Sequence, residues 1–132
     1  MIEGIGHIGI FVSDVAAAVE SLCKTFDLEM PVIKDVPERS MKVAVIPWGA
    51  VMLELVEDYS NDGSVARMVK ERGNFIHHFC LVSGNIEADI ANLRSKGAQM
   101  ATPEPTLGLR GKRIAFIKSG VLDQVPIELS EP

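Results

Sequence analysis

The chain contains an internal repeat in which each half keeps one histidine and one glutamate. The sequence His-Ile-Gly-Ile-Phe at residues 7–11 reappears as His-Phe-Cys-Leu-Val at residues 78–82. Likewise Met-Leu-Glu-Leu-Val at residues 52–56 reappears as Pro-Ile-Glu-Leu-Ser at residues 126–130. A duplicated fold brings equivalent residues together at its pseudo-twofold axis. The repeat therefore predicts that four side chains converge: His7, Glu54, His78 and Glu128.

These four side chains form a typical ligand set for a divalent metal ion. Two imidazoles and two carboxylates suit Zn, Co, Ni, Mn or Fe(II), and the choice among these ions stays open. Glu54 and Glu128 each lie in a strongly apolar segment. Because burying an unpaired carboxylate costs several kcal/mol, a bound cation would compensate for their burial.

The register of the repeat distinguishes between the adjacent histidines His77 and His78. Apolar positions between the repeated segments align as Val15 with Ile86, Val19 with Ile90, and Leu22 with Leu93. This alignment pairs His7 with His78. Residues two apart on a strand share a face, so Cys80 faces the same way as His78, and His77 faces the opposite way. We expect His77 either to pack against other side chains or to contact a metal ligand without binding the ion itself. We expect Cys80 to be a small, unreactive residue.

Size and composition favour one globular domain over residues 1–132. The chain of 14.3 kDa is 47% hydrophobic, which is enough to form a core. The repeat divides it into a module at about 1–57, a connecting segment at 58–74 and a module at about 75–132. A net charge of −5 argues against a nucleic-acid partner. The sequence has no membrane-spanning run, no export signal and no CxxC spacing, so we expect a cytoplasmic protein.

Local patterns predict the same order of elements in both halves. The first half has a strand at 5–12, a helix at about 15–25 capped by Asp14, a short strand at 28–34 and a hairpin of strands 41–46 and 50–56. Trp48, in the hairpin turn, is interpreted as a packing residue. A helical segment follows within 58–74. The second half has a strand at 76–82, a helix at about 86–96 and strands near 99–101, 112–118 and 125–130. The predicted fold is α+β, with two paired βαβββ modules forming a curved sheet around a metal-containing cleft.

A basic cluster lies in the loop before strand 112–118. It comprises Arg110, Lys112 and Arg113, and the neighbouring glycines allow a close approach of the backbone. Arginine and lysine in such a setting are typical of phosphate recognition, although a solvated loop has the same composition.

The chain resembles the vicinal oxygen chelate (glyoxalase/bleomycin resistance/dioxygenase) superfamily, and within it most closely the methylmalonyl-CoA epimerase family. The resemblance is carried by residues 7–14, 52–56, 64–67, 73–78, 108–116 and 127–129. The double histidine after a glycine-containing turn and the Gly-Leu-Arg-Gly segment are the more specific parts. Some epimerases carry an acidic residue on the strand before the first glutamate ligand, whereas strand 41–46 has no carboxylate.

This resemblance implies a metal bound by His7, Glu54, His78 and Glu128, and a homodimer. It implies proton abstraction at the carbon between a thioester and a carboxylate, through an enolate. Glu128 and Glu54 are the candidate catalytic carboxylates, and Glu128 is a candidate for both ligand and base. Arg110, Lys112 and Arg113 would then bind the phosphates of an acyl-CoA-like substrate.

Two alternatives use the same fold. A glyoxalase-I-type lyase, such as lactoylglutathione lyase, has the same ligand set but needs a glutathione pocket. A non-catalytic member would bind a small molecule without exchanging its protons. A ring-cleaving dioxygenase fits less well, because it uses two histidines and one carboxylate and would leave one glutamate surplus.

Overall fold

A computed structural model describes residues 1–132 as three helices and nine strands, arranged in two compact units. One unit comprises Ile8–His77, and the other comprises Met1–His7 together with His78–Pro132. The boundaries fall inside two strands, β1 (Ile2–Phe11) and β5 (Phe75–Ser83). Each of these strands therefore contributes residues to both units.

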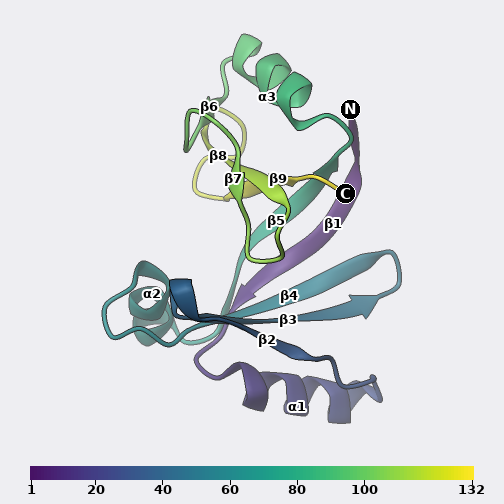
Figure 1. Cartoon of the computed structure of the whole chain (residues 1–132), viewed down its shortest axis with the longest axis vertical. Coiled ribbons are helices and arrows are strands. Elements are labelled where there is room, and N and C mark those ends of the chain that lie inside the picture. Colours follow the sequence, from purple (N-terminus) through teal and green to yellow (C-terminus); the bar gives the residue numbers. More distant parts are fainter. The chain divides into compact units, whose positions relative to one another are not determined.

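The unit of residues 8–77 is a helix packed on antiparallel strands (Figure 1). Its strands run in the order β2-β3-β4, followed by the second part of β1. Apolar residues of α1 and of the strands form one buried core that includes Val19, Ala44 and Leu55. The elements of this unit, besides its parts of β1 and β5, are α1 (Val15–Phe26), β2 (Ile33–Val36), a 3-10 turn (Pro37–Arg39), β3 (Met41–Trp48), β4 (Val51–Asp58) and α2 (Ser64–Arg72).

Helix α1 begins where its capping residue predicts. The Asp14 side chain accepts a hydrogen bond from the Ala17 backbone N–H, which satisfies one of the free donors of the first turn. Buried residues Val15, Val19 and Cys23 recur every four positions and so lie on one face. The helix ends at Asp27, whose φ of 54° is left-handed.

Helix α2 receives its cap from the preceding strand. The side chain of Asp58, at the end of β4, accepts hydrogen bonds from the Ala66 N–H at 3.1 Å and from Ser60. Partial burial raises the pKa of Asp58, but the hydrogen bonds from Ser60 and Ala66 outweigh burial and hold the pKa below its ordinary value. The carboxylate form is therefore the one that stabilises this connection.

Replacing Asp58 by alanine should lower the free energy of unfolding by about 1 kcal/mol at neutral pH, because a helix-capping acceptor is lost. A lowered pKa means that the stabilisation is present above the unfolded-state pKa of about 3.9 and is lost as the pH falls through the folded-state value. Urea unfolding at several pH values would measure this difference. Asp62→Ala, an exposed change of equal charge, is the control. A difference that does not shrink in acid would contradict the assignment.

The unit of residues 1–7 and 78–132 repeats the layout of helix and strands (Figure 1). Its strand order is β1-β5-β9-β8-β6, with β7 paired to β8. Strand β9 is parallel to β5 and antiparallel to β8. Helix α3 packs Ile86 and Ile90 against Ala115 and Leu129. The new elements are α3 (Ile86–Ser95), β6 (Gln99–Met100), β7 (Thr106–Leu107), β8 (Arg113–Ser119) and β9 (Ile127–Ser130).

The unit of residues 8–77 therefore contains a strand, a helix and three further strands in chain order, and the other unit has the same order with the short strand β7 added. This confirms the predicted α+β class and the paired βαβββ modules. One predicted strand is displaced: the expected strand at 28–34 forms only from Ile33. Pro31 has no backbone N–H to donate to a ladder, which is consistent with the late start. The short strand β7 was not predicted. None of the three helices is both long and apolar enough to cross a membrane.

Candidate metal centre

Three of the four predicted ligands come together in the unit of residues 1–7 and 78–132. His7 comes from β1, His78 from β5 and Glu128 from β9, and only 2%, 5% and 5% of these residues is exposed. Parallel pairing of β5 with β9 places Cys80 directly opposite Glu128. Since residues two apart share a face, the same pairing brings His78 to the side of the sheet that carries Glu128.

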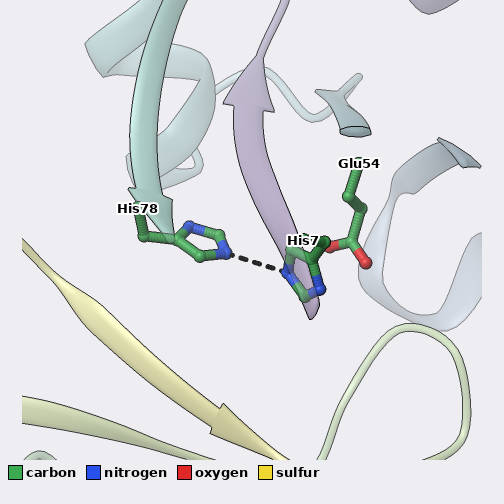
Figure 2. Close-up of side chains that lie close together, drawn as sticks. All are labelled: His7, Glu54 and His78. Carbon is green, nitrogen blue, oxygen red and sulfur yellow. Dashed lines mark hydrogen bonds between the residues drawn. The ribbon is translucent and has the colours of Figure 1, made fainter. Parts of the chain in front are cut away.

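The donor atoms of these residues converge on one point. His7 Nε2 lies 3.1 Å from Glu128 Oε1 and 3.3 Å from His78 Nε2 (Figure 2), and His78 Nε2 lies 3.9 Å from Glu128 Oε1. The Cys80 sulfur belongs to the same cluster, because the donor atoms of His7, Cys80 and Glu128 lie within 4.8 Å of one another. Two imidazole nitrogens and a carboxylate oxygen form a donor set suited to a borderline divalent ion. The buried cluster thus fits the metal that the sequence predicts.

The charge state of Glu128 suits a metal ligand. Burial raises the pKa of Glu128, but the hydrogen bond from His7, the electrostatic attraction of the imidazoles of His78 and His7, and a hydrogen bond from Cys80 outweigh it. The net effect holds the pKa of Glu128 below its ordinary value. The group is therefore ionised at neutral pH, as a ligand must be.

Glu54 lies in the other unit, at the centre of β4, where it pairs with Val45 of β3. It is buried, with 7% of the residue exposed. Its neighbours Leu55 and Val56 are also buried. A buried carboxylate needs a compensating partner, which is the property that the ligand hypothesis requires of Glu54.

His77 has the surroundings of a packing residue. Its ring stacks on Phe11, with centroids 4.2 Å apart and planes 17° from parallel. Phe75 meets the same imidazole edge to face at 6.1 Å. Adjacent histidines on one strand therefore face different environments, in line with the register argument that favoured His78.

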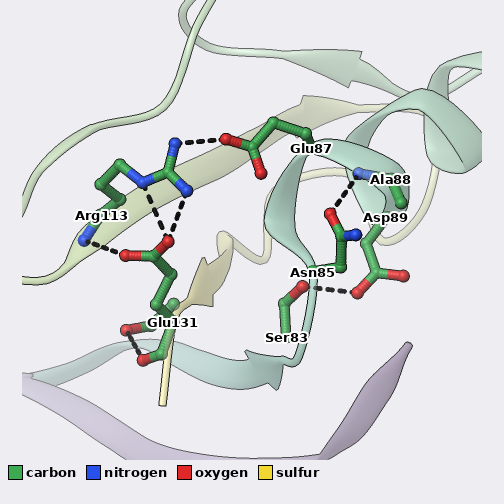
Figure 3. Close-up of polar contacts among 8 residues, drawn as sticks. Ser83, Asn85, Glu87, Ala88, Asp89, Arg113 and Glu131 are labelled. Carbon is green, nitrogen blue, oxygen red and sulfur yellow. Dashed lines mark hydrogen bonds and ion pairs between the residues drawn. The ribbon is translucent and has the colours of Figure 1, made fainter.

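The three residues of the predicted phosphate cluster have different surroundings. Arg113, at the start of β8, forms ion pairs with Glu131 and Glu87 (Figure 3), and the hydrogen bonds to these carboxylates raise the pKa of its guanidinium. Arg110 lies against the cluster of candidate metal ligands, with Nη2 at 3.2 Å from His7 Nδ1. Lys112 is half-buried in the same loop.

Sequence reasoning did not predict the contact between Arg110 and His7. The loop that carries Arg110 has no apolar period from which its position could be derived. Cys80, by contrast, could be placed beside His78 from strand alternation alone, although its closeness to Glu128 depends on the pairing of β5 with β9.

Comparison with known proteins gives relatives along nearly the whole chain. A model of the Glyoxalase/Bleomycin resistance protein/Dioxygenase superfamily matches residues 6–116. An uncharacterised Bacillus subtilis protein is 29% identical over 126 residues, which are 96% of this chain and 90% of that protein. The ethylmalonyl-CoA/methylmalonyl-CoA epimerase of Cereibacter sphaeroides is 26% identical over 133 residues, 99% of each chain. A Streptomyces coelicolor methylmalonyl-CoA epimerase variant, solved in complex with 2-nitronate-propionyl-CoA, is 28% identical with a TM-score of 0.87, covering 99% of this chain and 98% of that one.

Proposed function

Because the chain belongs to the glyoxalase/bleomycin resistance protein/dioxygenase superfamily, we propose that it is a metal-dependent epimerase of a methylmalonyl-CoA-like acyl thioester. The relatives that carry an activity in their names include acyl-CoA epimerases that match 96–99% of the chain. These relatives are 22–26% identical to the chain. They support this reaction class but do not identify the acyl group of the substrate. The proposed homodimer and cytoplasmic location remain predictions.

One observation carries the proposal: the convergence of His7, His78 and Glu128 at distances of 3.1–3.9 Å in a buried cluster. We propose that Glu54 is the fourth ligand, because it is the repeat partner of Glu128 and is buried within its own unit. Two imidazoles and two carboxylates would make a neutral site with a divalent ion. His7, Glu54, His78 and Glu128 would hold the ion, and the ion would supply Lewis-acid chemistry at this site.

The metal ion supplies Lewis-acid polarisation of a carbonyl oxygen, which makes the adjacent C–H more acidic. The protein's own residues supply the rest. Glu128 is ionised at neutral pH, so it has the protonation state that a general base requires before it takes a proton. Glu54 is the second candidate for proton transfer, so that removal on one face and return on the other would invert the carbon.

The CoA phosphates are assigned to the loop between β7 and β8. Lys112 is the residue of the basic cluster that we propose for this contact. Arg113 is held by Glu87 and Glu131 and would have to exchange a carboxylate for a phosphate. We therefore propose that Arg113 mainly fixes the start of β8.

Proton exchange tests the proposed reaction directly. Metal-loaded protein incubated with (2R)- or (2S)-methylmalonyl-CoA in D₂O should incorporate deuterium at the α-carbon, detected by mass spectrometry or NMR. Protein treated with a chelator should lose this exchange, because the carbonyl is no longer polarised.

The alternatives give different results in the same experiment. Absence of α-deuterium with metal bound would contradict the epimerase proposal. Turnover of the hemithioacetal of methylglyoxal and glutathione would then indicate the glyoxalase-type lyase. Inactivity toward both substrates, with a ligand still bound, would indicate the non-catalytic binding protein.

A further inference from the structure

Cys80 brings a thiol sulfur into the cluster of candidate metal ligands. It lies on β5 two residues after His78, so both side chains leave the strand on the same face. Parallel pairing of β5 with β9 sets Cys80 directly opposite Glu128. Only 1% of Cys80 is exposed, and one donor atom each of His7, Cys80 and Glu128 lie within 4.8 Å of one another. The discontinuous unit thus holds nitrogen, oxygen and sulfur donors of its own.

The spacing of these donor atoms is close to the spacing around one metal ion. Zinc binds sulfur at about 2.3 Å and nitrogen or oxygen at about 2.1 Å, so two ligands of a tetrahedral ion lie about 3.5 Å apart. His7 Nε2 and Glu128 Oε1 are 3.1 Å apart. The 4.8 Å limit leaves the Cys80 sulfur at most about 1.3 Å farther away than a ligand would be. Side-chain rotation can close such a difference without moving the strands.

The present contacts of the thiol are compatible with binding to a metal ion. Cys80 donates a hydrogen bond to Glu128, and its Sγ also lies 3.7 Å from the carbonyl oxygen of Leu81. A thiol is a weak hydrogen-bond donor, so these contacts are readily exchanged for a stronger partner. A divalent ion is such a partner, because it displaces the proton of a coordinating thiol to solvent and binds the thiolate.

The second cysteine of the chain has the surroundings of a residue used for packing alone. Cys23, on α1, is 3% exposed and lies in an apolar core. Its Sγ lies 3.6 Å from the backbone carbonyl oxygen of Glu29, and it belongs to no group of candidate metal ligands. Cys23 and Cys80 are therefore similarly buried but differ in their neighbours, which makes Cys23 a matched control.

We propose that the Cys80 sulfur is a further ligand of the metal ion at this centre. A thiolate is a soft ligand that favours zinc, whereas carboxylates and water suit Mn²⁺ and Mg²⁺. The sulfur would therefore narrow the choice of ion that the nitrogen and oxygen ligands leave open. The inference rests on the proposed metal centre, and it holds whether or not Glu54 also binds the ion. It replaces the expectation that Cys80 is unreactive.

Absorption spectroscopy of the Co²⁺-loaded protein tests this ligand without any substrate. A thiolate bound to Co²⁺ gives a strong charge-transfer band in the near ultraviolet, which imidazole and carboxylate ligands do not give. Wild type should show this band, Cys80→Ser should lose it, and Cys23→Ser should keep it. A phosphine keeps the protein reduced in this experiment, because thiol reductants bind Co²⁺ themselves.

The preference between ions gives a second measurement. Competition between Zn²⁺ and Mn²⁺ for the site measures the ratio of the two affinities. Cys80→Ser should lower the preference for Zn²⁺ about tenfold or more, since a hydroxyl replaces the soft sulfur, and Cys23→Ser should leave it unchanged. Should the Cys80 variant fail to fold, X-ray absorption of the Zn²⁺-loaded wild type should still show a sulfur neighbour at about 2.3 Å.

Four results would overturn the inference: a Co²⁺-loaded wild type without the charge-transfer band, an equal band in Cys80→Ser, an unchanged ion preference in that variant, or zinc surrounded by nitrogen and oxygen alone. These outcomes are independent of the deuterium experiment. Exchange of methylmalonyl-CoA without a sulfur ligand would reject the role of Cys80 alone. A sulfur ligand without exchange would reject the epimerase reaction alone. Failure of the wild type to bind any of these ions would reject both.

Discussion

His78→Ala should lower the affinity for Co²⁺ by at least about 100-fold, whereas His77→Ala should bind the ion as wild type does. The first change removes a nitrogen that lies 3.3 Å from His7 Nε2 in the buried cluster. The second removes an imidazole that stacks on Phe11. Titration of the metal-free proteins with Co²⁺, followed by its visible absorption, would measure both affinities.

The paired design separates a ligand from a neighbour of the same chemical type. Both variants lose one imidazole from the same strand, so a general effect of losing a histidine from β5 would appear in both. His77→Ala should lose some stability, about 1 kcal/mol from the aromatic contact. Equal Co²⁺ affinities in the two variants would remove His78 from the metal centre.

Glu128→Gln should reduce α-deuterium exchange by at least about 100-fold even when enough metal is added to saturate the site. The amide keeps a ligand oxygen but is a much poorer proton acceptor than the carboxylate. Glu128 is ionised at neutral pH, and its lowered pKa makes it a weaker base than an ordinary glutamate. The fold-reduction in exchange should therefore lie toward the lower end of the range found when a general base is lost. Deuterium incorporation by the Co²⁺-saturated variant would give the rate.

Glu54→Gln is the matched variant, because Glu54 is the repeat partner of Glu128. Both variants should bind metal more weakly if both carboxylates are ligands. Retained exchange in metal-saturated Glu128→Gln would show that Glu128 is a ligand only, and Glu54 would then be the remaining candidate base. Unchanged metal affinity in Glu54→Gln would remove Glu54 from the ligand set.

Features set by neighbouring residues could be predicted closely from the sequence. Helix α1 begins at Val15 because Asp14 caps it, and both facts follow from a few adjacent residues. The burial of Glu54 and Glu128 was predicted from the repeat together with their apolar strands, because a lone glutamate in a strand most often faces solvent. Strand alternation and the repeat together favoured His78 over His77.

Features that depend on distant residues could not be predicted, except for the ligands that the internal repeat pairs. The contact of Arg110 with His7 joins a loop without apolar period to the first strand. Arg113 forms ion pairs with Glu87 of α3 and with Glu131, which follows β9. Glu87 and Glu131 are distant from Arg113 in the sequence, so the local composition indicated a phosphate-binding cluster and not these ion pairs. The division of β1 after His7 also cannot be seen in the sequence of the strand, because it reflects which partners each half of the strand packs with.

The division of β1 and β5 gives the metal centre a second consequence, for folding. His7 is the last residue of the first segment of the discontinuous unit, and His78 is the first residue of its second segment. An ion that binds both would act as a cross-link between positions 71 residues apart in the chain. Such a cross-link restricts the unfolded chain, so metal binding and closure of the long loop would be thermodynamically coupled. His7 and His78, which would hold the ion for catalysis, would thus also link the point where the chain leaves this unit to the point where it returns.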